Sequence, residues 1–400
     1  VPTELTKEYQ RKLFKTLIDT LKNKQICAVY GLRRVGKSTL IFQLIQHLLT
    51  NKVPPEKILY FSFDQKVHEL KELFSAYTEL HQQELRNGKF YFFLDEIQKL
   101  DNWENSIKIY YDLYPNIKFF ISGSSHLGLK KKGAESLAGR IEFLVLDPLS
   151  FKEWLVLNKT NLNFDKPDLY AQELKQHFEW YRKTPFPEIA TVRENITIRK
   201  YIDDFILSRI ISYDIKKEFV NVDTELLETL KDIFFNDPGI LLNVDHLAKN
   251  LQRGKEILLR HINYLEQGLL IRIIKNYRQS TLSSSRKLRK VYPFHPCFCQ
   301  SAPEGKLIEN LFIAILDAKH YWRDGNKEVD IVVNKFPIEV KYVEKISSED
   351  LGNTIYFMEL FKVKRGLMIT KNEEKLKTEL IYIPAWKAAL EGKEILALKT

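Results

Sequence analysis

The first third of the chain alternates apolar runs with amphipathic segments. Apolar runs occupy residues 25–30, 57–63, 89–94 and 117–121, each about the length of an ordinary strand. After the first run, three leucines recur at helical spacing: Leu40, Leu44 and Leu48. Strands that are apolar on both faces are typical of parallel sheets covered by helices. The pattern therefore predicts an α/β core with a parallel sheet.

In later segments of the chain the apolar residues recur at other spacings. Residues 151–215 are predicted to be mainly helical, with an amphipathic stretch at 201–215. Residues 216–295 predict three helices and a strand, the order of a winged helix-turn-helix, with Gly254 in or near its turn. Residues 328–342, EVDIVVNKFPIEVKY, alternate with a period of two, which predicts two adjacent strands.

A glycine-rich loop lies between the first strand and the first leucine-rich helix. Its sequence, GLRRVGKST, matches G-x-x-x-x-G-K-[ST]. Backbone N–H groups of such a loop wrap phosphates, while Lys37 adds a positive charge at the β/γ position and Ser38 offers a hydroxyl to Mg²⁺. ATP and Mg²⁺ are therefore the predicted cofactors, and a degenerate loop that binds no nucleotide is the alternative. The predicted nucleotide-binding residues are Gly31, Leu32, Arg33, Arg34, Val35, Gly36, Lys37, Ser38 and Thr39.

Polar side chains follow the third and fourth apolar runs. Asp95 and Glu96 come at the carboxyl end of a predicted parallel strand, where open α/β sheets place their ligands. Asp95 suits the Mg²⁺ shell and Glu96 suits the residue that polarises the attacking water. In the next strand Ser122 or Ser124 is a candidate sensor of the γ-phosphate, with capping of the following helix as the alternative.

Arg140 precedes another predicted strand. It is a candidate arginine finger for the phosphates of its own or a neighbouring subunit. Contact with a neighbouring subunit would require a homo-oligomer. An ordinary surface arginine is the alternative.

Positive charge is concentrated in one segment. The whole chain has a formal net charge of +10, and residues 241–290 contain eleven Lys or Arg against three Asp or Glu. Such concentration favours contact with DNA phosphates over the alternative, in which the segment packs on the nucleotide domain or a partner. His261 lies on the predicted recognition helix, and the predicted DNA contacts are Lys255, Arg260, Arg286, Lys287, Arg289 and Lys290.

Composition limits the class of protein. The 400 residues are 44% hydrophobic, enough for two or three domains with cores. Neither a signal-peptide pattern nor a run long enough to span a membrane is present, so we expect a cytoplasmic protein without a membrane partner. The cysteines are too few and too unevenly spaced for a disulfide framework or a four-ligand zinc site. They are Cys27, Cys297 and Cys299.

The chain resembles the AAA-class ATPases of archaea and bacteria that carry a C-terminal nuclease-related domain. The resemblance rests on GLRRVGKST, LDEIQKL, ISGSS, ESLAGR and LDPLSFKEWL, in that order. It departs from the family where Thr184 and Pro185 replace paired glycines before Phe-Pro-Glu. The domains implied are an ATPase core (residues 1–150), a helical lid (151–215), a winged helix (216–295) and a nuclease-like domain (296–400).

The order of elements after residue 303 resembles the core of PD-(D/E)xK nucleases. By that resemblance Asp330 and Glu339 match the two metal-binding acids, Lys341 the lysine and Glu309 an accessory acid on the preceding helix. Two carboxylates would hold Mg²⁺ beside a phosphate, and the lysine would position water or offset charge. On local pattern alone, a hairpin with a solvated charged face is the alternative.

Two functions from different classes follow. The first is a Mg²⁺-dependent ATPase that binds DNA through the winged helix and cleaves it at the C-terminal site. The alternative is a regulatory switch, in which ATP gates assembly or partner binding and the C-terminal domain is catalytically silent.

Overall fold

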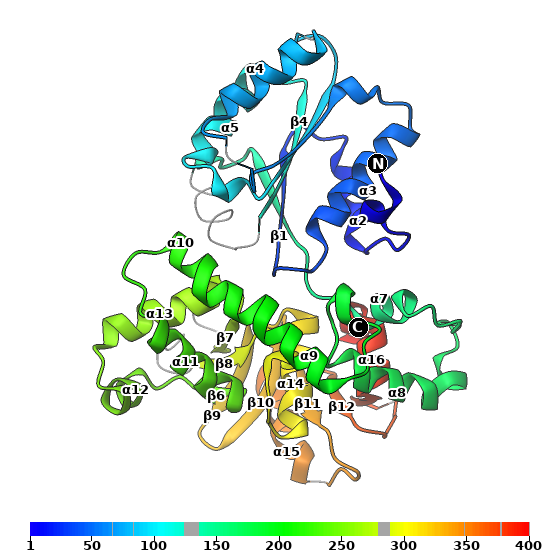
Figure 1. Ribbon diagram of the computed structural model, residues 1–400. Coiled ribbons are helices and arrows are strands. Elements are labelled where there is room, and N and C mark those ends of the chain that lie inside the picture. Colours follow the sequence, from blue (N-terminus) through cyan, green and yellow to red (C-terminus); the bar gives the residue numbers. More distant parts are fainter. Residues whose placement is uncertain are drawn as a thin grey trace. The chain divides into compact units, whose positions relative to one another are not determined.

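The computed structural model describes residues 1–65, 67–82, 84–123, 136–278, 289–347, 349–376 and 378–399. The chain forms two compact units, Val1–Pro148 and Leu149–Thr400 (Figure 1). Each unit contains its own β-sheet. The glycine-rich loop belongs to the N-terminal unit, and the predicted nuclease-like residues belong to the C-terminal unit.

The N-terminal unit is built on a parallel sheet with strand order β2-β3-β4-β1-β5. In Figure 1, α2 and α3 lie on one side of this sheet and α4 and α5 on the other. The predicted α/β core with a parallel sheet is therefore confirmed. The strands are β1 (Ile26–Tyr30), β2 (Ile58–Ser62), β3 (Phe90–Asp95), β4 (Ile117–Gly123) and β5 (Ile141–Val145), and the helical elements are α1 (Thr3–Thr6), α2 (Leu13–Thr20), α3 (Lys37–Thr50), η1 (Pro55–Lys57), α4 (Leu70–His81), η2 (Ile97–Lys99) and α5 (Trp103–Leu113).

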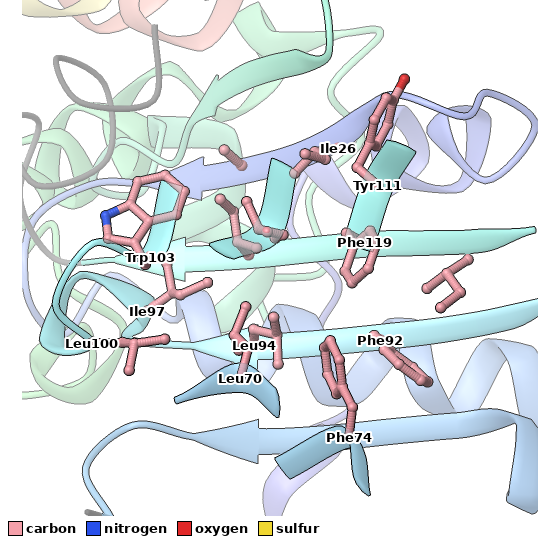
Figure 2. Packing of buried hydrophobic residues seen from close by; sticks show 14 of the residues in the cluster. Ile26, Leu70, Phe74, Phe92, Leu94, Ile97, Leu100, Trp103, Tyr111 and Phe119 are labelled. Atoms are coloured by element: carbon pink, nitrogen blue, oxygen red, sulfur yellow. The ribbon is translucent and has the colours of Figure 1, made fainter. Parts of the chain in front are cut away.

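Burial along each strand follows its place in this sheet. Strands β1 and β4 are buried at every position, whereas the edge strands β2 and β5 are only half-buried at most positions. Aromatic side chains fill the layer between the sheet and α4: the ring of Phe92 lies 5.0 Å from that of Phe74 and 5.9 Å from that of Phe119 (Figure 2). Such pairs add about 0.5–1.5 kcal/mol each beyond the burial of their area. This packing fixes the strand ends that carry the polar residues.

One sheet also runs through the C-terminal unit, with strand order β13-β12-β11-β10-β9-β7-β8-β6. Strand β7 pairs in parallel with β9, so strands predicted for 216–295 and for 296–400 lie in the same sheet. The division at residue 295 stays a prediction. The strands are β6 (Ile240–Leu241), β7 (Ile271–Asn276), β8 (Arg289–Pro293), β9 (His320–Asp324), β10 (Lys327–Val333), β11 (Phe336–Lys341), β12 (Gly366–Thr370) and β13 (Leu380–Pro384).

Helices surround this second sheet. Helix α15 packs on β9 and β10, where the ring of Phe357 lies 5.4 Å from that of Trp322. Strand β8 pairs antiparallel with both β7 and β6 and contacts α11, whereas α13 contacts β7. The helical elements are α7 (Phe151–Leu157), η4 (Pro167–Tyr170), α8 (Ala171–Tyr181), η5 (Pro187–Ile189), α9 (Asn195–Tyr201), η6 (Ile202–Leu207), η7 (Ile210–Ile215), α10 (Lys216–Glu218), α11 (Thr224–Asn236), α12 (Val244–Leu251), α13 (Lys255–Gln267), η8 (Pro296–Phe298), α14 (Glu304–Leu316), η9 (Glu349–Leu351), α15 (Gly352–Phe361), α16 (Ala385–Glu391) and η10 (Gly392–Lys399).

The helices predicted as a lid, residues 151–215, belong to the C-terminal unit. Lys387 on α16 donates a hydrogen bond of 2.8 Å to Asp168, which joins this segment to the end of the chain. At the departure from the family pattern, Trp154 Nε1 donates to the Thr184 carbonyl at 3.1 Å, and the Leu149 N–H donates to the Pro185 carbonyl at 2.8 Å. The turn without glycines is therefore anchored to α7. Among the described residues, no helix has both the length and the apolar character needed to cross a membrane.

Candidate functional site

The glycine-rich loop connects β1 to α3 and depends on two of its glycines. A Cβ at Gly31 would lie 2.2 Å from the Leu146 carbonyl oxygen, so no larger residue fits where the loop passes the end of β5. Gly36 has a φ of 98° and immediately precedes α3. That left-handed conformation costs glycine little, because glycine has no Cβ. Both glycines are therefore needed for a loop that presents its backbone N–H groups at a helix N-terminus.

Lys37 is buried and folded back on the loop. Its ammonium donates to the carbonyl oxygens of Gly31 at 3.1 Å and Leu32 at 2.9 Å. From the N-terminal side Arg11 braces the loop by donating to the Val35 carbonyl at 2.7 Å. The lysine of the motif thus lies against the loop where phosphates are expected.

Asp95, at the end of β3, is oriented by three neighbouring side chains. Ser38 Oγ donates to its Oδ2 at 2.6 Å, Tyr60 Oη donates to the same oxygen at 3.2 Å, and Ser122 donates to Oδ1. The loop hydroxyl and the carboxylate therefore meet, and their predicted role as Mg²⁺ ligands stays a prediction. Mg²⁺ takes oxygen ligands and keeps several waters, so one hydroxyl beside one carboxylate fits this ion.

Glu96 has a left-handed backbone, with a φ of 54°, directly after the strand. Its N–H donates to Asp95 Oδ1 at 3.1 Å, and its Oε2 accepts a hydrogen bond of 2.8 Å from Gln98 Nε2. This turn places Glu96 directly after Asp95, and the hydrogen bond from Gln98 restricts the direction of its carboxylate. Its predicted role as the group that polarises water stays a prediction.

Arg140 lies at the opposite end of the strands from the glycine loop. Its carbonyl accepts from the Ile26 N–H at the start of β1, whereas the loop follows Tyr30 at the end of β1. A five-residue strand spans about 16 Å. The guanidinium instead donates to both carboxylate oxygens of Asp112, at 3.0 and 3.2 Å. The prediction that Arg140 reaches the phosphates of its own subunit is therefore wrong, and contact with a neighbouring subunit stays a prediction.

Ser122 and Ser124 were both candidate sensors. Ser122 is fully buried on β4 and bonds to Asp95, so it orients the acid beside the predicted phosphate site. Ser124 lies outside the described residues.

A second polar site, here called the acidic cluster, lies in the C-terminal unit. Strands β10 and β11 are antiparallel, and the register that pairs Ile331 with Ile338 places Asp330 opposite Glu339. The Val340 N–H donates to Asp330 Oδ2 at 2.9 Å, and the Asp330 N–H donates to Glu339 Oε2 at 3.4 Å. The two carboxylates therefore share one face of the hairpin, with Glu339 buried and Asp330 half-buried, which is against the alternative of a fully solvated charged face. The cluster consists of Lys290, Tyr292, Glu309, Glu328, Asp330, Glu339 and Lys341.

Hydrogen bonds and ion pairs connect the members of the acidic cluster. Lys341 Nζ lies 3.1 Å from Glu339 Oε1 and 3.8 Å from Asp350. Tyr292 donates a hydrogen bond to Glu309 on α14. The four residues predicted from the nuclease resemblance thus lie in one cluster with residues that were not predicted.

Burial and mutual repulsion perturb the acids of this cluster. Burial and the neighbouring Asp330 charge raise the pKa of Glu309 to about 7. Burial likewise raises the pKa of Asp330, and burial together with the Asp330 charge raises the pKa of Glu339 well above its ordinary value. Although burial disfavours its charged form, the pKa of Lys341 is held above its usual value by Glu339 and Asp330. Burial is thus the main reason why these acids are harder to ionise than usual, and the charge of Asp330 adds to it for Glu309 and Glu339.

The donor set of the acidic cluster allows a small divalent cation bound by two carboxylates. Glu309 Oε2 and Asp330 Oδ1 accept no hydrogen bond within the described residues. In the ranges that the structure describes, no three His, Cys, Asp or Glu side chains are placed to hold one metal together. Mg²⁺ commonly uses one or two protein carboxylates, with water and phosphate oxygens completing its shell. The cluster fits that kind of site and not an all-protein cage.

The residues predicted to contact DNA differ in how exposed they are. Lys255 and Arg260 are exposed on α13, where Lys255 forms an ion pair with Asp245. Arg289 is half-buried at the start of β8. Arg286 and Lys287 lie outside the described residues.

Two basic residues of that segment do not face solvent. Lys290 is only 6% exposed and forms ion pairs with Glu309 and Glu328, so its prediction as a DNA contact is wrong. His261 is 2% exposed, and its Nε2 accepts from the Asp223 N–H at 2.9 Å, so it supports the start of α11. Burial inside the unit is the physical reason in both cases.

Tyr60, Gln98, Tyr292 and Glu328 were not predicted as site residues, and Lys290 was predicted only as a DNA contact. Tyr60 lies within an apolar run, and without the strand order the sequence does not show that this run pairs with the strand that carries Asp95. Gln98 follows Asp95 and Glu96 so closely that its sequence position was a usable signal. The partners of Lys290 lie 19 and 38 residues away, and no local pattern connects them.

Comparison with known proteins shows a family match around the glycine-rich loop. Residues 23–155 match the family described as "AAA domain". Two uncharacterized proteins of Methanocaldococcus jannaschii are 27% and 28% identical to this chain; the alignments cover 92% and 81% of this chain and 85% and 76% of those proteins. An uncharacterized protein of Haemophilus influenzae is 25% identical over 90% of this chain and 94% of its own length.

A solved structure also shows partial similarity. The ORC2 protein of Aeropyrum pernix, in its ADP form, covers 77% of this chain and 96% of its own chain, with 13% identity and a TM-score of 0.41. That score is too low to establish a common fold. The similarity that does bear on the N-terminal unit is the match of residues 23–155 to the AAA-domain family, and the geometry of the glycine-rich loop agrees with a P-loop domain there.

Proposed function

We propose that the protein binds ATP with Mg²⁺ at the glycine-rich loop and hydrolyses it. The observation that carries this proposal is the contact of Ser38 with Asp95, with Glu96 at the next position held by Gln98. Bound Mg²⁺ would neutralise phosphate charge. Lys37 would leave the Gly31 and Leu32 carbonyls to meet the β/γ-phosphates, and Glu96 would orient the attacking water. The test is turnover by Glu96→Gln, because that change removes the carboxylate and keeps its shape.

DNA is the proposed partner of the C-terminal unit. The order α11, β6, α12, α13, β7, β8, with β8 between β6 and β7, supports the winged-helix interpretation. Exposed Lys255 and Arg260 on α13, together with the net charge of residues 241–290, support phosphate contact. Binding assays with duplex, forked, single-stranded and hairpin DNA would define the preferred form.

The acidic cluster is proposed as a divalent-cation site of PD-(D/E)xK type. Convergence of Glu309, Asp330, Glu339 and Lys341 supports it, and the two open carboxylate oxygens suit Mg²⁺ or Mn²⁺. Plasmid nicking by the wild type and by Asp330→Asn, with and without ATP, tests for cleavage. Nicking that needs Asp330 would support a nuclease.

A silent nuclease-like domain is the second candidate. The observation that favours it is Lys290, whose ammonium already pairs with Glu309 and Glu328. ATP would then gate assembly or partner binding, and nicking would be absent from wild type and variant alike.

A further inference from the structure

Lys290 is the buried cation of the acidic cluster. It lies on β8, and its Nζ is 3.6 Å from Glu309 Oε1, pairs also with Glu328, and is 5.0 Å from the centre of the Tyr321 ring. A lysine is rarely this buried unless it is paired. The position therefore belongs to the cluster and not to the surface.

The same strand makes a second contact with Glu309. Lys290 and Tyr292 are two residues apart on β8, so both side chains point to one face of the strand. Tyr292 donates a hydrogen bond to the same Glu309 oxygen that lies near Lys290. Two groups of β8 thus occupy one oxygen of Glu309, and its other oxygen accepts nothing from the described residues.

The two lysines of the cluster serve different acids. Lys341 pairs with Glu339 and with Asp350, whereas Lys290 pairs with Glu309 and Glu328. Asp330 lies between these pairs and is influenced by both lysines. Removing Lys290 would leave Glu309 without its ion pair, whereas Glu328 would keep Arg323, whose Nη1 lies 3.7 Å from Glu328 Oε2.

We propose that Lys290 is a built-in competitor of divalent cations: its ammonium neutralises Glu309 and Glu328 until Mg²⁺ or Mn²⁺ binds at Glu309 and Asp330. This inference rests on the proposed divalent-cation site. The competition follows from electrostatics, because an ion and an ammonium that use the same carboxylate charge repel each other at short range. Cation binding is therefore coupled to release of a side chain of β8, the strand that follows residues 279–288.

Mn²⁺ binding to the full chain without nucleotide tests the proposal. The free Mn²⁺ signal in electron paramagnetic resonance would be titrated for wild type, Lys290→Met and Lys275→Met, the last being an exposed lysine on the adjacent strand β7. Each titration is repeated with Asp330→Asn added to the variant, and only the Mn²⁺ binding that this change abolishes is assigned to the acidic cluster. This subtraction removes any Mn²⁺ bound at the glycine-rich loop. Lys290→Met should bind Mn²⁺ at least about tenfold more tightly than wild type, because a nearby positive charge is gone. Lys275→Met should match wild type.

Thermal unfolding gives an independent readout. Loss of Lys290 leaves the buried Glu309 carboxylate without its ion pair, so the midpoint of Lys290→Met should be low without Mn²⁺ and rise by about 5 °C or more at saturating Mn²⁺. The wild-type midpoint should respond less. The double variant Lys290→Met/Glu309→Gln should regain stability without Mn²⁺ and lose the response, because one carboxylate has gone with the ammonium.

The outcomes separate the inference from the site on which it rests. Equal Asp330-dependent affinity in wild type and Lys290→Met would contradict the competition and leave the cation site intact. No Asp330-dependent binding in any variant would overturn both. If Lys290→Met is unfolded alone, recovery of cooperative melting with Mn²⁺ supports the proposal, and failure to recover contradicts it.

Discussion

Ser38 Oγ lies 2.6 Å from Asp95 Oδ2, which joins the end of the glycine-rich loop to the acid at the end of β3. The two residues are 57 positions apart in the sequence. Their contact follows from the parallel sheet, because β1 and β3 both end at the same edge, on either side of β4. Hydroxyl and carboxylate therefore meet where a nucleotide-bound Mg²⁺ is expected.

Lys37→Ala should weaken ATP binding strongly, because the loop then lacks the ammonium proposed to meet the β/γ-phosphates. Titration with a fluorescent ATP analogue measures the affinity, and we expect a loss of at least about 100-fold on the scale of a lost charge-assisted contact. Lys71→Ala, on the exposed face of α4, is the matched control and should bind normally. Unchanged affinity of Lys37→Ala would show that nucleotide binds elsewhere.

The DNA proposal concerns α13. Lys255→Ala/Arg260→Ala should weaken binding to all DNA sequences and lower the slope of log affinity against log salt by about 2, because each phosphate contact contributes about 0.9. Lys345→Ala/Lys364→Ala removes two other exposed lysines of the same unit and should leave the slope unchanged. Should the α13 variant keep the wild-type slope, the DNA surface lies elsewhere on the chain.

The sequence predicts the site of the N-terminal unit better than the site of the C-terminal unit. In the N-terminal unit, consecutive apolar runs and a specific motif determine which strand ends carry the loop and the acids. Arg140 was misplaced, although the sequence held the signal: a residue before a parallel strand lies at the edge opposite the phosphate loop.

In the C-terminal unit the alternation of residues 328–342 predicted the Asp330–Glu339 pair, because register within a hairpin is local. The role of Lys290 was not predictable. Its burial depends on β7 joining β9, a long-range pairing that brings β8 near the acidic cluster. The composition of residues 241–290 suggested that the charge of Lys290 belongs to a DNA-binding surface. In the structure that side chain is buried and paired with acids.

His295 makes stability depend on pH. It is fully buried beside Arg272, and burial followed by that positive charge lowers the pKa of its imidazole to about 3. The folded state then binds fewer protons than the unfolded state below the ordinary histidine pKa of about 6.5. The stability from neutral His295 is complete above about pH 6.5 and is lost as the pH falls toward 3, at up to ~1.4 kcal/mol per pH unit.

Urea unfolding followed by tryptophan fluorescence at pH 7, 6, 5 and 4 measures this slope. His295→Asn should be less stable than wild type at pH 7 and should lose stability less steeply on acidification. The control is His246→Asn on the exposed surface of α12, which should retain the wild-type slope. A wild-type slope in His295→Asn would assign the acid sensitivity to other groups.

Steady-state turnover and ATP affinity of Glu96→Gln, measured on the same preparation, decide whether Glu96 activates the attacking water. Glu72→Gln on the exposed face of α4 serves as the control. We expect Glu96→Gln to bind ATP with nearly wild-type affinity and to hydrolyse it at least about 100-fold more slowly, the range expected for loss of a general base. Hydrolysis by Glu96→Gln at the wild-type rate would contradict that role of Glu96.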